Sequence, residues 1–247
     1  MSSAAPRRAM VLAAGLGLRM RPLTLTRPKP LIALAGRTLL DRALDALADV
    51  GVEHAVVNTH YLGEMIAAHL AERTRPRVRL SPENSLLETG GGVANALPLL
   101  GEAPFFVVNA DIAWSDGRLP ALARLAGAWT DAMDALLLVQ PVDSATGYDG
   151  AGDFAIAPVS GIGCGRLVRR SGTRAPFVFT GVQLLHPRLF RDAPGGAFSL
   201  NLLYDRAEAA GRLFGVVHDG AWYHVGTPAA LAEAESLILE RRSRGTA

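Results

Sequence analysis

The sequence has a single cysteine and no long apolar run. With only Cys164 among 247 residues, no disulfide can form within the chain and no pair of cysteines can hold zinc. No apolar stretch approaches the roughly 20 residues that span a bilayer. Arg7 and Arg8 precede a short apolar run, but glycines and arginines interrupt it and no small-residue cleavage site follows, which argues against a signal peptide. We therefore expect a cytoplasmic protein with no membrane partner.

The chain also has little net charge. Its 25 Lys and Arg residues nearly balance 23 Asp and Glu residues, giving +2 at pH 7. Short basic clusters at Arg7-Arg8 and Arg241–Arg244 are typical of solvated chain ends, so no nucleic-acid partner is expected. With 49% apolar and 19% charged residues, the composition indicates a globular fold that buries a sizeable core.

Short apolar runs alternate with helical patterns over the first 140 residues. In the first interval between runs, Leu40, Leu44 and Leu47 share one helical face. Thr38 can cap the start of that helix and Gly51 suits its end. The alternation predicts βαβ units and a parallel sheet. The expected strands are Ala9–Ala14, Ala55–Thr59, Val78–Ser81, Phe105–Asn109 and Asp134–Gln140.

The pattern changes after about residue 141. Strands become shorter and turns become rich in glycine, as in Gly161–Gly165. A strand is expected at Phe177–Leu185, a helix near Leu200–Ala210, and a last helix from Thr227 and Pro228, where threonine can cap and proline fits the first turn. This half indicates a mixed, partly antiparallel sheet.

A glycine-rich loop follows the first expected strand. Residues 12–24 read Leu-Ala-Ala-Gly-Leu-Gly-Leu-Arg-Met-Arg-Pro-Leu-Thr, and residues 28–31 read Pro-Lys-Pro-Leu. Gly15 and Gly17 leave backbone N–H groups open to an anion, while Arg19 and Lys29 add positive charge. The loop has neither the third glycine of a dinucleotide-binding turn nor the end of a Walker loop. A tight turn explains the glycines alone, but the basic continuation favours a phosphate site.

Two further segments carry candidate ligand groups. Asp111 follows the apolar strand Phe105–Asn109 and therefore lies near its carboxyl end, where open α/β sheets place ligands. Its carboxylate suits Mg²⁺ shared with a phosphate; a turn aspartate is the alternative. In Glu88–Gly92, three glycines precede the helical stretch Val93–Leu100. Bare amides there could approach a base or ribose, although a flexible helix start has the same pattern.

Taken in order, these motifs resemble the sugar-1-phosphate nucleotidylyltransferase family. The family signature, Leu-Ala-Ala-Gly-x-Gly-x-Arg-x-x-Pro-Leu-Thr followed by Pro-Lys-Pro, matches at every fixed position. The resemblance covers nearly the whole chain and implies an α/β, Rossmann-like three-layer sandwich with a mostly parallel central sheet. It also implies a single domain, 1–247, with a nucleotide-binding half at 1–140 and a sugar-binding half at 141–247. Other matching segments are Ser81–Glu83, Leu87–Gly92, Val108–Asp111, Gly152–Phe154, Phe179–Gly181 and Gly226–Pro228.

The resemblance implies an enzyme that joins a nucleoside triphosphate to a sugar 1-phosphate and releases pyrophosphate, with Mg²⁺ as cofactor. Within the family, this short form is most similar to the N-acetylmuramate-1-phosphate uridylyltransferases of cell-wall recycling. UTP and N-acetylmuramate 1-phosphate are therefore the expected substrates. Relatives that use other bases with mannose, glucose or heptose phosphates leave alternatives open. So does a non-catalytic regulatory subunit that binds nucleotide sugars. We expect a monomer or weak dimer.

The resemblance also implies roles for individual residues. Arg19 and Lys29 would be catalytic, neutralising charge while the sugar phosphate oxygen attacks the α-phosphorus in line. Asp111 would bind the metal. In the sugar pocket, implied at Gly152, Asp153, Thr180 and Gly181, only the carboxylate of Asp153 and the hydroxyl of Thr180 offer obvious sugar contacts. The implied nucleotide-binding positions are Ala13, Ala14, Gly15, Gly17, Glu83, Thr89, Gly90 and Asn109.

One position departs from the family pattern. Members usually carry a second metal-binding aspartate in a Trp-x-Asp-x-Gly-Thr-Pro segment, but residues 222–228 read Trp-Tyr-His-Val-Gly-Thr-Pro. Imidazole is a poor ligand for Mg²⁺ and a good one for Mn²⁺, Co²⁺ or Zn²⁺. His224 could bind such a softer metal, hold a metal-bound water, or lie outside the metal site. We expect it within reach of the metal or its waters, with Mn²⁺ as the alternative cofactor.

Overall fold

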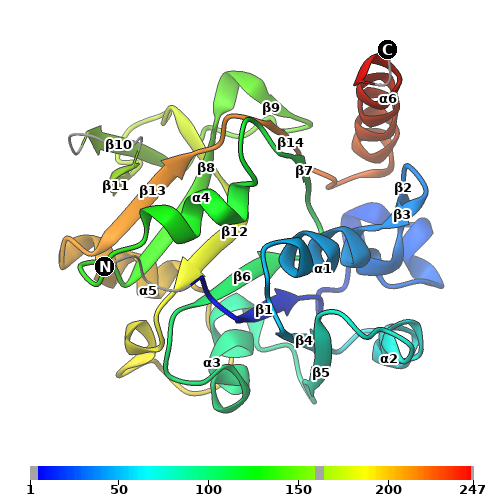
Figure 1. Ribbon diagram of the computed structural model, residues 1–247, viewed down its shortest axis with the longest axis horizontal. Coiled ribbons are helices and arrows are strands. Elements are labelled where there is room, and N and C mark those ends of the chain that lie inside the picture. The colour runs from blue at the N-terminus through cyan, green and yellow to red at the C-terminus, as the bar shows by residue number, and fades with distance from the viewer. Residues whose placement is uncertain (1–4, 159–163, 246–247) are drawn as a thin grey trace.

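The computed structural model describes residues 5–158 and 164–245, and within them a nine-stranded sheet runs through the molecule (Figure 1). Seven of these described strands, β5, β4, β1, β6, β8, β13 and β10, run in one direction, while β12 and β11 run in the other. The expected mostly parallel sheet with antiparallel pairs in the second half is confirmed. From edge to edge the strands are β10 (Phe154–Pro158), β11 (Cys164–Arg169), β13 (Leu213–Val217), β8 (Ala135–Pro141), β12 (Phe177–Leu185), β6 (Phe105–Asn109), β1 (Arg8–Leu12), β4 (His54–Thr59) and β5 (Arg77–Pro82).

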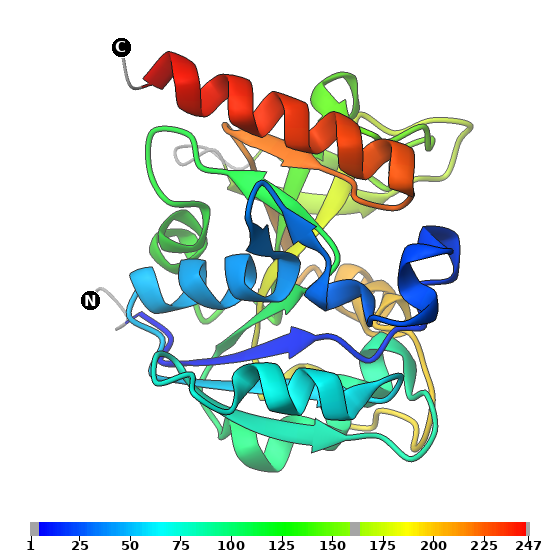
Figure 2. The same cartoon turned by 90° about the vertical axis from the view of Figure 1, so that its right-hand side faces the viewer.

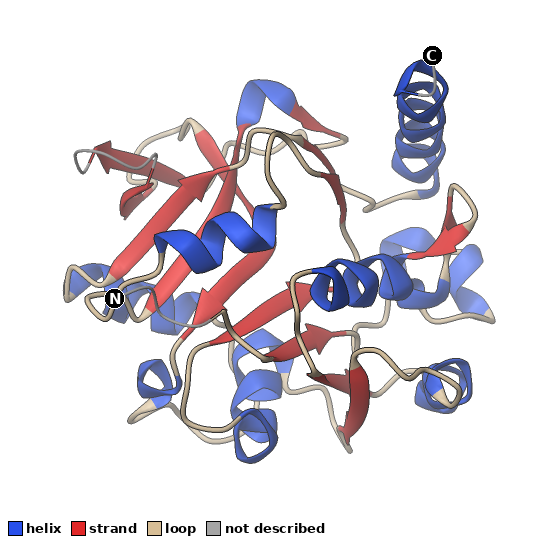
Figure 3. Cartoon of the chain, viewed as in Figure 1, coloured by secondary structure: helices blue, strands red, loops and turns tan. Residues whose placement is uncertain are grey.

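Helices cover both faces of this sheet and complete the three-layer α/β sandwich (Figure 3). One face packs against α1 (Leu39–Asp49), α2 (Gly63–Leu70) and α4 (Ala121–Ala128). The other packs against α3 (Glu88–Leu100) and α5 (Asn201–Ala209). Short 3₁₀ helices lie at Leu18–Met20, Leu23–Leu25, Lys29–Leu31, Val142–Ser144 and Pro187–Phe190. None of the helices in the described part of the chain has the length and apolar character that crossing a membrane requires.

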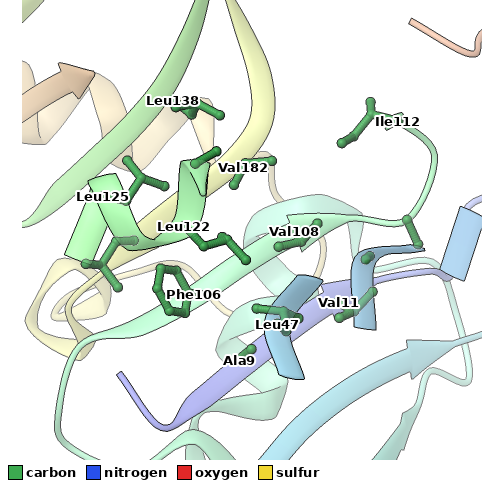
Figure 4. Close-up of a cluster of buried hydrophobic side chains, with 14 of the residues drawn as sticks. Ala9, Val11, Leu47, Phe106, Val108, Ile112, Leu122, Leu125, Leu138 and Val182 are labelled. Atoms are coloured by element: carbon green, nitrogen blue, oxygen red, sulfur yellow. The ribbon is translucent and has the colours of Figure 1, made fainter. Parts of the chain in front are cut away.

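The central strands are apolar on both faces because both faces are covered. In β1, Ala9 and Val11 point toward α1 and α4, whereas Met10 points to the opposite layer. Phe106 and Phe105 of β6 divide in the same way. Figure 4 shows the first of these clusters, in which side chains of β1, β6, α1 and α4 meet. Because side chains alternate between the two faces of a strand, each central strand contributes to the apolar clusters on both sides of the sheet.

A small sheet and the last helix lie outside the main sheet. The sheet has the order β7 (Ala113–Ser115), β14 (Ala221–Tyr223), β9 (Ala145–Thr146). Helix α6 (Pro228–Gly245) lies along the hairpin of β2 (Ala33–Leu34) and β3 (Arg37–Thr38), as Figure 2 shows. Its Ala234 and Ile238 belong to the apolar cluster between them. The Glu235 carboxylate accepts a hydrogen bond from the Ala35 N–H at 2.8 Å. Segments from both ends of the sequence thereby share one apolar cluster.

The predicted helix ends are confirmed. Thr38 Oγ1 accepts from the Asp41 N–H at 3.0 Å at the start of α1, and Gly51 follows that helix with φ of 87°. Thr227 Oγ1 accepts from the Ala230 N–H at 3.2 Å at the start of α6. These hydrogen bonds satisfy N–H groups that a helix leaves without partners.

Several element boundaries differ from the sequence-based expectation. Strand β1 ends at Leu12, so Ala13 and Ala14 belong to the loop. Cys164 begins β11 and does not lie in a turn. Residues 161–163 of the expected glycine-rich turn lie outside the described residues. These are differences of extent, and each expected strand named above is present.

The three glycines at residues 90–92 lie inside α3, which corrects the expectation that they precede a helix. Close packing explains them. A Cβ at Gly90 would collide with Phe198, one at Gly91 with the Gly196 carbonyl oxygen, and one at Gly92 would lie 2.9 Å from side-chain atoms of both Asn58 and Glu83. Each glycine costs about 1 kcal/mol of helix propensity relative to alanine, and the helix gains close approach to its neighbours in return.

The packing role of these glycines predicts opposite effects of two alanine substitutions in helices. Gly91→Ala should lower the free energy of unfolding by about 1–3 kcal/mol because the new methyl group overpacks against backbone. Gly127→Ala in α4 has no atom within 4 Å of the added Cβ and should raise it by up to about 1 kcal/mol. Urea denaturation of both variants measures the difference. Equal stability of the two variants would contradict the packing explanation.

Candidate active site

A pocket of about 460 Å³ opens where β1, β4, β5 and β6 reach their carboxyl ends. Ten of the sixteen residues singled out from the sequence line it, although they come from separate segments of the first half of the chain. They are Ala13, Ala14, Gly15, Gly17, Arg19, Lys29, Glu83, Thr89, Asn109 and Asp111. The parallel strand order produces this convergence, since the ends of adjacent parallel strands meet at one edge of the sheet.

The glycine-rich loop folds tightly over Thr24. Gly17 has φ of 61°, and a Cβ there would lie 3.0 Å from the Thr24 methyl carbon and 3.1 Å from Lys29 Cβ. The Thr24 hydroxyl donates to the Gly17 carbonyl at 2.8 Å. Gly15 faces open space, with no atom within 4 Å of where its Cβ would be. The loop therefore leaves room beside its backbone, and the next turn carries the exposed Arg19 into the same pocket.

Lys29 and Asp111 form an ion pair inside the pocket. The Lys29 Nζ donates to Asp111 Oδ2 at 3.0 Å. The lysine side chain is only 7% exposed, whereas the aspartate side chain is 43% exposed. Burial of an ammonium group requires such a partner. The carboxylate remains open to solvent, so it can still meet a ligand.

A chain of buried hydrogen bonds joins the strand ends beneath the pocket. Asn58 Oδ1 accepts from the Ala13 N–H at 2.7 Å, and Asn58 Nδ2 donates to Glu83 Oε1 at 2.7 Å. Glu83 Oε2 accepts from the Leu87 N–H at 3.0 Å. Both carboxylate oxygens of Glu83 are thus engaged by protein groups. Sequence reasoning missed Asn58, whose signal was a polar side chain inside the apolar expected strand Ala55–Thr59.

His224 lies beside this pocket because of the small sheet. The backbone N–H of His224 donates to the Thr146 carbonyl at 2.9 Å. The preceding residue of β14, Tyr223, pairs with Ala113, two residues after Asp111. A Cβ at Gly226 would lie 2.7 Å from His224 Nε2 and 3.3 Å from an Arg19 guanidinium nitrogen. His224 and Arg19 therefore approach each other across Gly226.

The surroundings of the His224 imidazole favour its neutral form. Burial lowers the pKa of His224, and the nearby charges of Lys29 and Arg19 lower it further against the opposing effect of Asp111. Among the described residues, no hydrogen-bond partner of its ring is found. A neutral imidazole keeps a lone pair that can bind a metal or accept a hydrogen bond from water.

Asp111 and His224 could supply only part of a metal site. Within residues 5–158 and 164–245, no group of three His, Cys, Asp or Glu side chains is placed to hold a metal ion. One carboxylate with a nearby imidazole does fit a cation that takes its other ligands from phosphate oxygens and water, as Mg²⁺ commonly does. The residues present are thus compatible with a metal that arrives with its nucleotide.

Gly90, although singled out for nucleotide binding, does not line the pocket. The N–H groups of Gly90 and Gly91 both donate to the Phe198 carbonyl, at 2.8 and 3.1 Å. The expectation that bare amides of this run face a base is therefore wrong for these two residues. Their amides connect α3 to the segment before α5.

The four residues assigned to the sugar pocket also lie outside the pocket lining. The Asp153 carboxylate accepts from the Phe179 N–H at 2.9 Å, and the fully buried Thr180 hydroxyl donates to the Leu138 carbonyl at 2.8 Å. Gly152 has φ of 76° and lies against the Ala175 carbonyl. Gly181 borders Asn109, a pocket residue, with a Cβ position 3.1 Å from Asn109 Cβ. The two side chains expected to touch sugar both make hydrogen bonds to backbone groups.

Known proteins resemble this chain over its whole length. It is 43% identical over 244 residues to the N-acetylmuramate alpha-1-phosphate uridylyltransferase of Caulobacter vibrioides, covering 96% of this chain and 99% of that protein. The protein of the same name from Neisseria meningitidis is 37% identical over 235 residues, or 93% of this chain and 97% of that protein. The resemblance expected from the motifs is confirmed.

A solved structure and a family model agree with these relatives. The structure of UDP-glucose pyrophosphorylase complexed with UDP-glucose superposes with a TM-score of 0.79 at 16% identity, covering 95% of this chain and 99% of that chain. At that identity the likeness shows the fold. The model of the family described as "Nucleotidyl transferase" matches residues 8–150, which include the glycine-rich loop, the Asn58 and Glu83 pair, and Asp111. The chain belongs to the nucleotidyl transferase family.

Proposed function

We propose that this protein transfers the uridylyl group of UTP to N-acetylmuramate 1-phosphate and releases pyrophosphate. The single observation that carries the reaction type is the meeting of Arg19, Lys29 and Asp111 around one pocket at the carboxyl edge of the sheet. The base and the sugar rest on the two full-length relatives, which are both named for that reaction. A sugar-1-phosphate nucleotidylyltransferase activity agrees with every one of these findings.

The reaction requires groups that neutralise phosphate charge. An oxygen of the sugar phosphate attacks the α-phosphorus, and the bond from that phosphorus to the β-phosphate oxygen breaks, so pyrophosphate leaves with the electron pair. No covalent enzyme intermediate forms. Charge spreads over the phosphate oxygens during this exchange, and Arg19 and Lys29 would stabilise it. Gly15 and Gly17 leave backbone N–H groups near the same anion.

A divalent cation is the proposed cofactor, since members of this family generally use one. Asp111 would hold it through the carboxylate oxygen that Lys29 does not bind, and His224 would bind it directly or through water. Such a cation polarises a phosphoryl oxygen and neutralises negative charge on the triphosphate. We propose Mg²⁺, with Mn²⁺ as the alternative that an imidazole ligand favours.

A substrate panel tests the activity. The purified protein is mixed with each of UTP, CTP, GTP and ATP, with N-acetylmuramate, glucose, mannose or heptose 1-phosphate, and with Mg²⁺ or Mn²⁺, and pyrophosphate release is followed. We expect the highest kcat/KM for UTP with N-acetylmuramate 1-phosphate. A different best pair would correct the substrates. No release from any pair would favour the regulatory, nucleotide-sugar-binding alternative.

Arg19→Ala should lower kcat by on the order of a hundredfold or more, because one lost donor to transition-state charge typically costs about 2.7–4 kcal/mol. Arg21→Ala is the matched control. Arg21 is also exposed and lies two residues further along the same loop, but it does not line the pocket. Its variant should keep most of the wild-type rate. Similar losses in both variants would indicate a general effect of loop charge and contradict a specific role for Arg19.

His224→Asp should shift the metal preference toward Mg²⁺, since a carboxylate is a harder ligand than imidazole. The measurement is the ratio of kcat/KM with Mn²⁺ to that with Mg²⁺, which we expect to fall in the variant. His218→Asn provides a comparison at a buried histidine that does not line the pocket. If the rate and the metal ratio of His224→Asp both equal those of the wild type, His224 is not near the metal.

A further inference from the structure

Glu88 combines a strained backbone with a position in the pocket wall. Its φ is 58°, a left-handed value that only four non-glycine residues adopt within the described part of the chain. Its side chain is exposed and lines the pocket that holds Arg19 and Lys29. Strained conformations of this kind persist where neighbouring structure fixes them, and they gather at functional sites.

Hydrogen bonds on both sides of Glu88 impose this conformation. Before it, the Leu87 N–H donates to Glu83 and the Leu87 carbonyl accepts from the Phe198 N–H at 3.1 Å. After it, Thr89 Oγ1 accepts from the Leu200 N–H at 2.9 Å. The residue is therefore fixed by contacts of its neighbours, while its own carboxylate has no hydrogen bond or ion pair to another described residue.

The other polar side chains nearby are already occupied. Glu83 uses both carboxylate oxygens, and Asn58 uses both its amide oxygen and its amide nitrogen, in the buried hydrogen bonds beneath the pocket. Glu88 is thus the acidic side chain at this end of the pocket that remains available to a ligand. A carboxylate only accepts hydrogen bonds, so its ligand must present a donor.

Charge decides which part of a nucleotide meets this carboxylate. Phosphates belong with the two cations, Arg19 and Lys29, because a carboxylate beside a triphosphate would be repelled. The neutral nucleoside then extends toward Glu88. On the Watson–Crick edge of a base, uracil and guanine carry a ring N–H, whereas cytosine and adenine carry a lone pair at the equivalent nitrogen.

We propose that the Glu88 carboxylate accepts a hydrogen bond from the ring N–H of the bound base and thereby selects UTP against CTP and ATP. This inference rests on the proposed function and adds to it a residue that determines base specificity. The left-handed backbone holds Glu88 in the lining of the pocket. Repulsion between the carboxylate and the ring lone pair of cytosine or adenine provides the discrimination.

Nucleotide affinity, measured by calorimetry in Mg²⁺ without sugar phosphate, tests this role separately from turnover. Glu88→Gly removes the carboxylate at a φ that glycine adopts without strain, so the variant should fold. We expect it to bind UTP about ten- to a hundredfold more weakly and CTP nearly as well as the wild type does. Glu88→Gln should recover part of the UTP affinity and gain affinity for CTP, because its amide can donate to the cytosine ring nitrogen.

Asp192→Gly is the matched control, since Asp192 is also an exposed acid with φ of 59° but does not line the pocket. It should leave the ratio of UTP to CTP affinity unchanged. A UTP analogue methylated at the ring nitrogen should bind the wild type as weakly as UTP binds Glu88→Gly.

Two results would overturn the inference. One is an unchanged UTP to CTP ratio in both Glu88 variants, and the other is a loss seen with UTP but not with 2′-deoxy-UTP, which would place the carboxylate on the ribose. If UTP binds with the expected selectivity but the substrate panel yields no pyrophosphate, the proposed function fails and the base-reading role stands.

Discussion

The buried hydrogen bonds between Ala13, Asn58 and Glu83 are the constraint on which the site depends. They tie the end of β1 to the ends of β4 and β5 with distances of 2.7 Å, and Glu83 extends the connection to the start of α3. Gly92 completes the arrangement, since a Cβ at this position of the helix would lie 2.9 Å from side-chain atoms of both Asn58 and Glu83. A buried carboxylate needs all of its hydrogen-bond partners. These hydrogen bonds therefore fix the strand ends, the helix and the glycine-rich loop relative to one another.

Next to these buried hydrogen bonds, the ion pair of Lys29 and Asp111 satisfies two requirements that otherwise conflict. A buried ammonium group must be paired, and a carboxylate offered to a cation must remain accessible. Lys29 is buried and Asp111 is partly exposed, so one oxygen of the carboxylate stabilises the lysine while Asp111 still lines the pocket. A triphosphate with its cation can therefore enter without leaving the ammonium unpaired, since the phosphates themselves replace part of the negative charge.

The sequence predicted the fold and brought together most of the residues that line the pocket, because both depend on local patterns. Apolar runs gave β1, β4, β6 and β8 within a few residues, and the parallel order that follows from them placed Asp111 beside Lys29. What it could not predict are contacts between distant segments. The glycines of α3 resembled a flexible helix start until Phe198 and Gly196 were seen against them. Likewise, nothing local shows that Asp153 and Thr180 hydrogen-bond to backbone.

The pairing of β7 with β14 explains how a histidine can replace a metal-binding aspartate in this arrangement. The register sets Tyr223 against Ala113 and so fixes residue 224 near Asp111, whatever its side chain. A second carboxylate there would face the first and would need a metal or another cation to offset the repulsion. Burial lowers the pKa of His224 and so favours its neutral form, which adds no charge to the group formed by Arg19, Lys29 and Asp111. A cation that arrived with a nucleotide would then meet one carboxylate and one imidazole at this position.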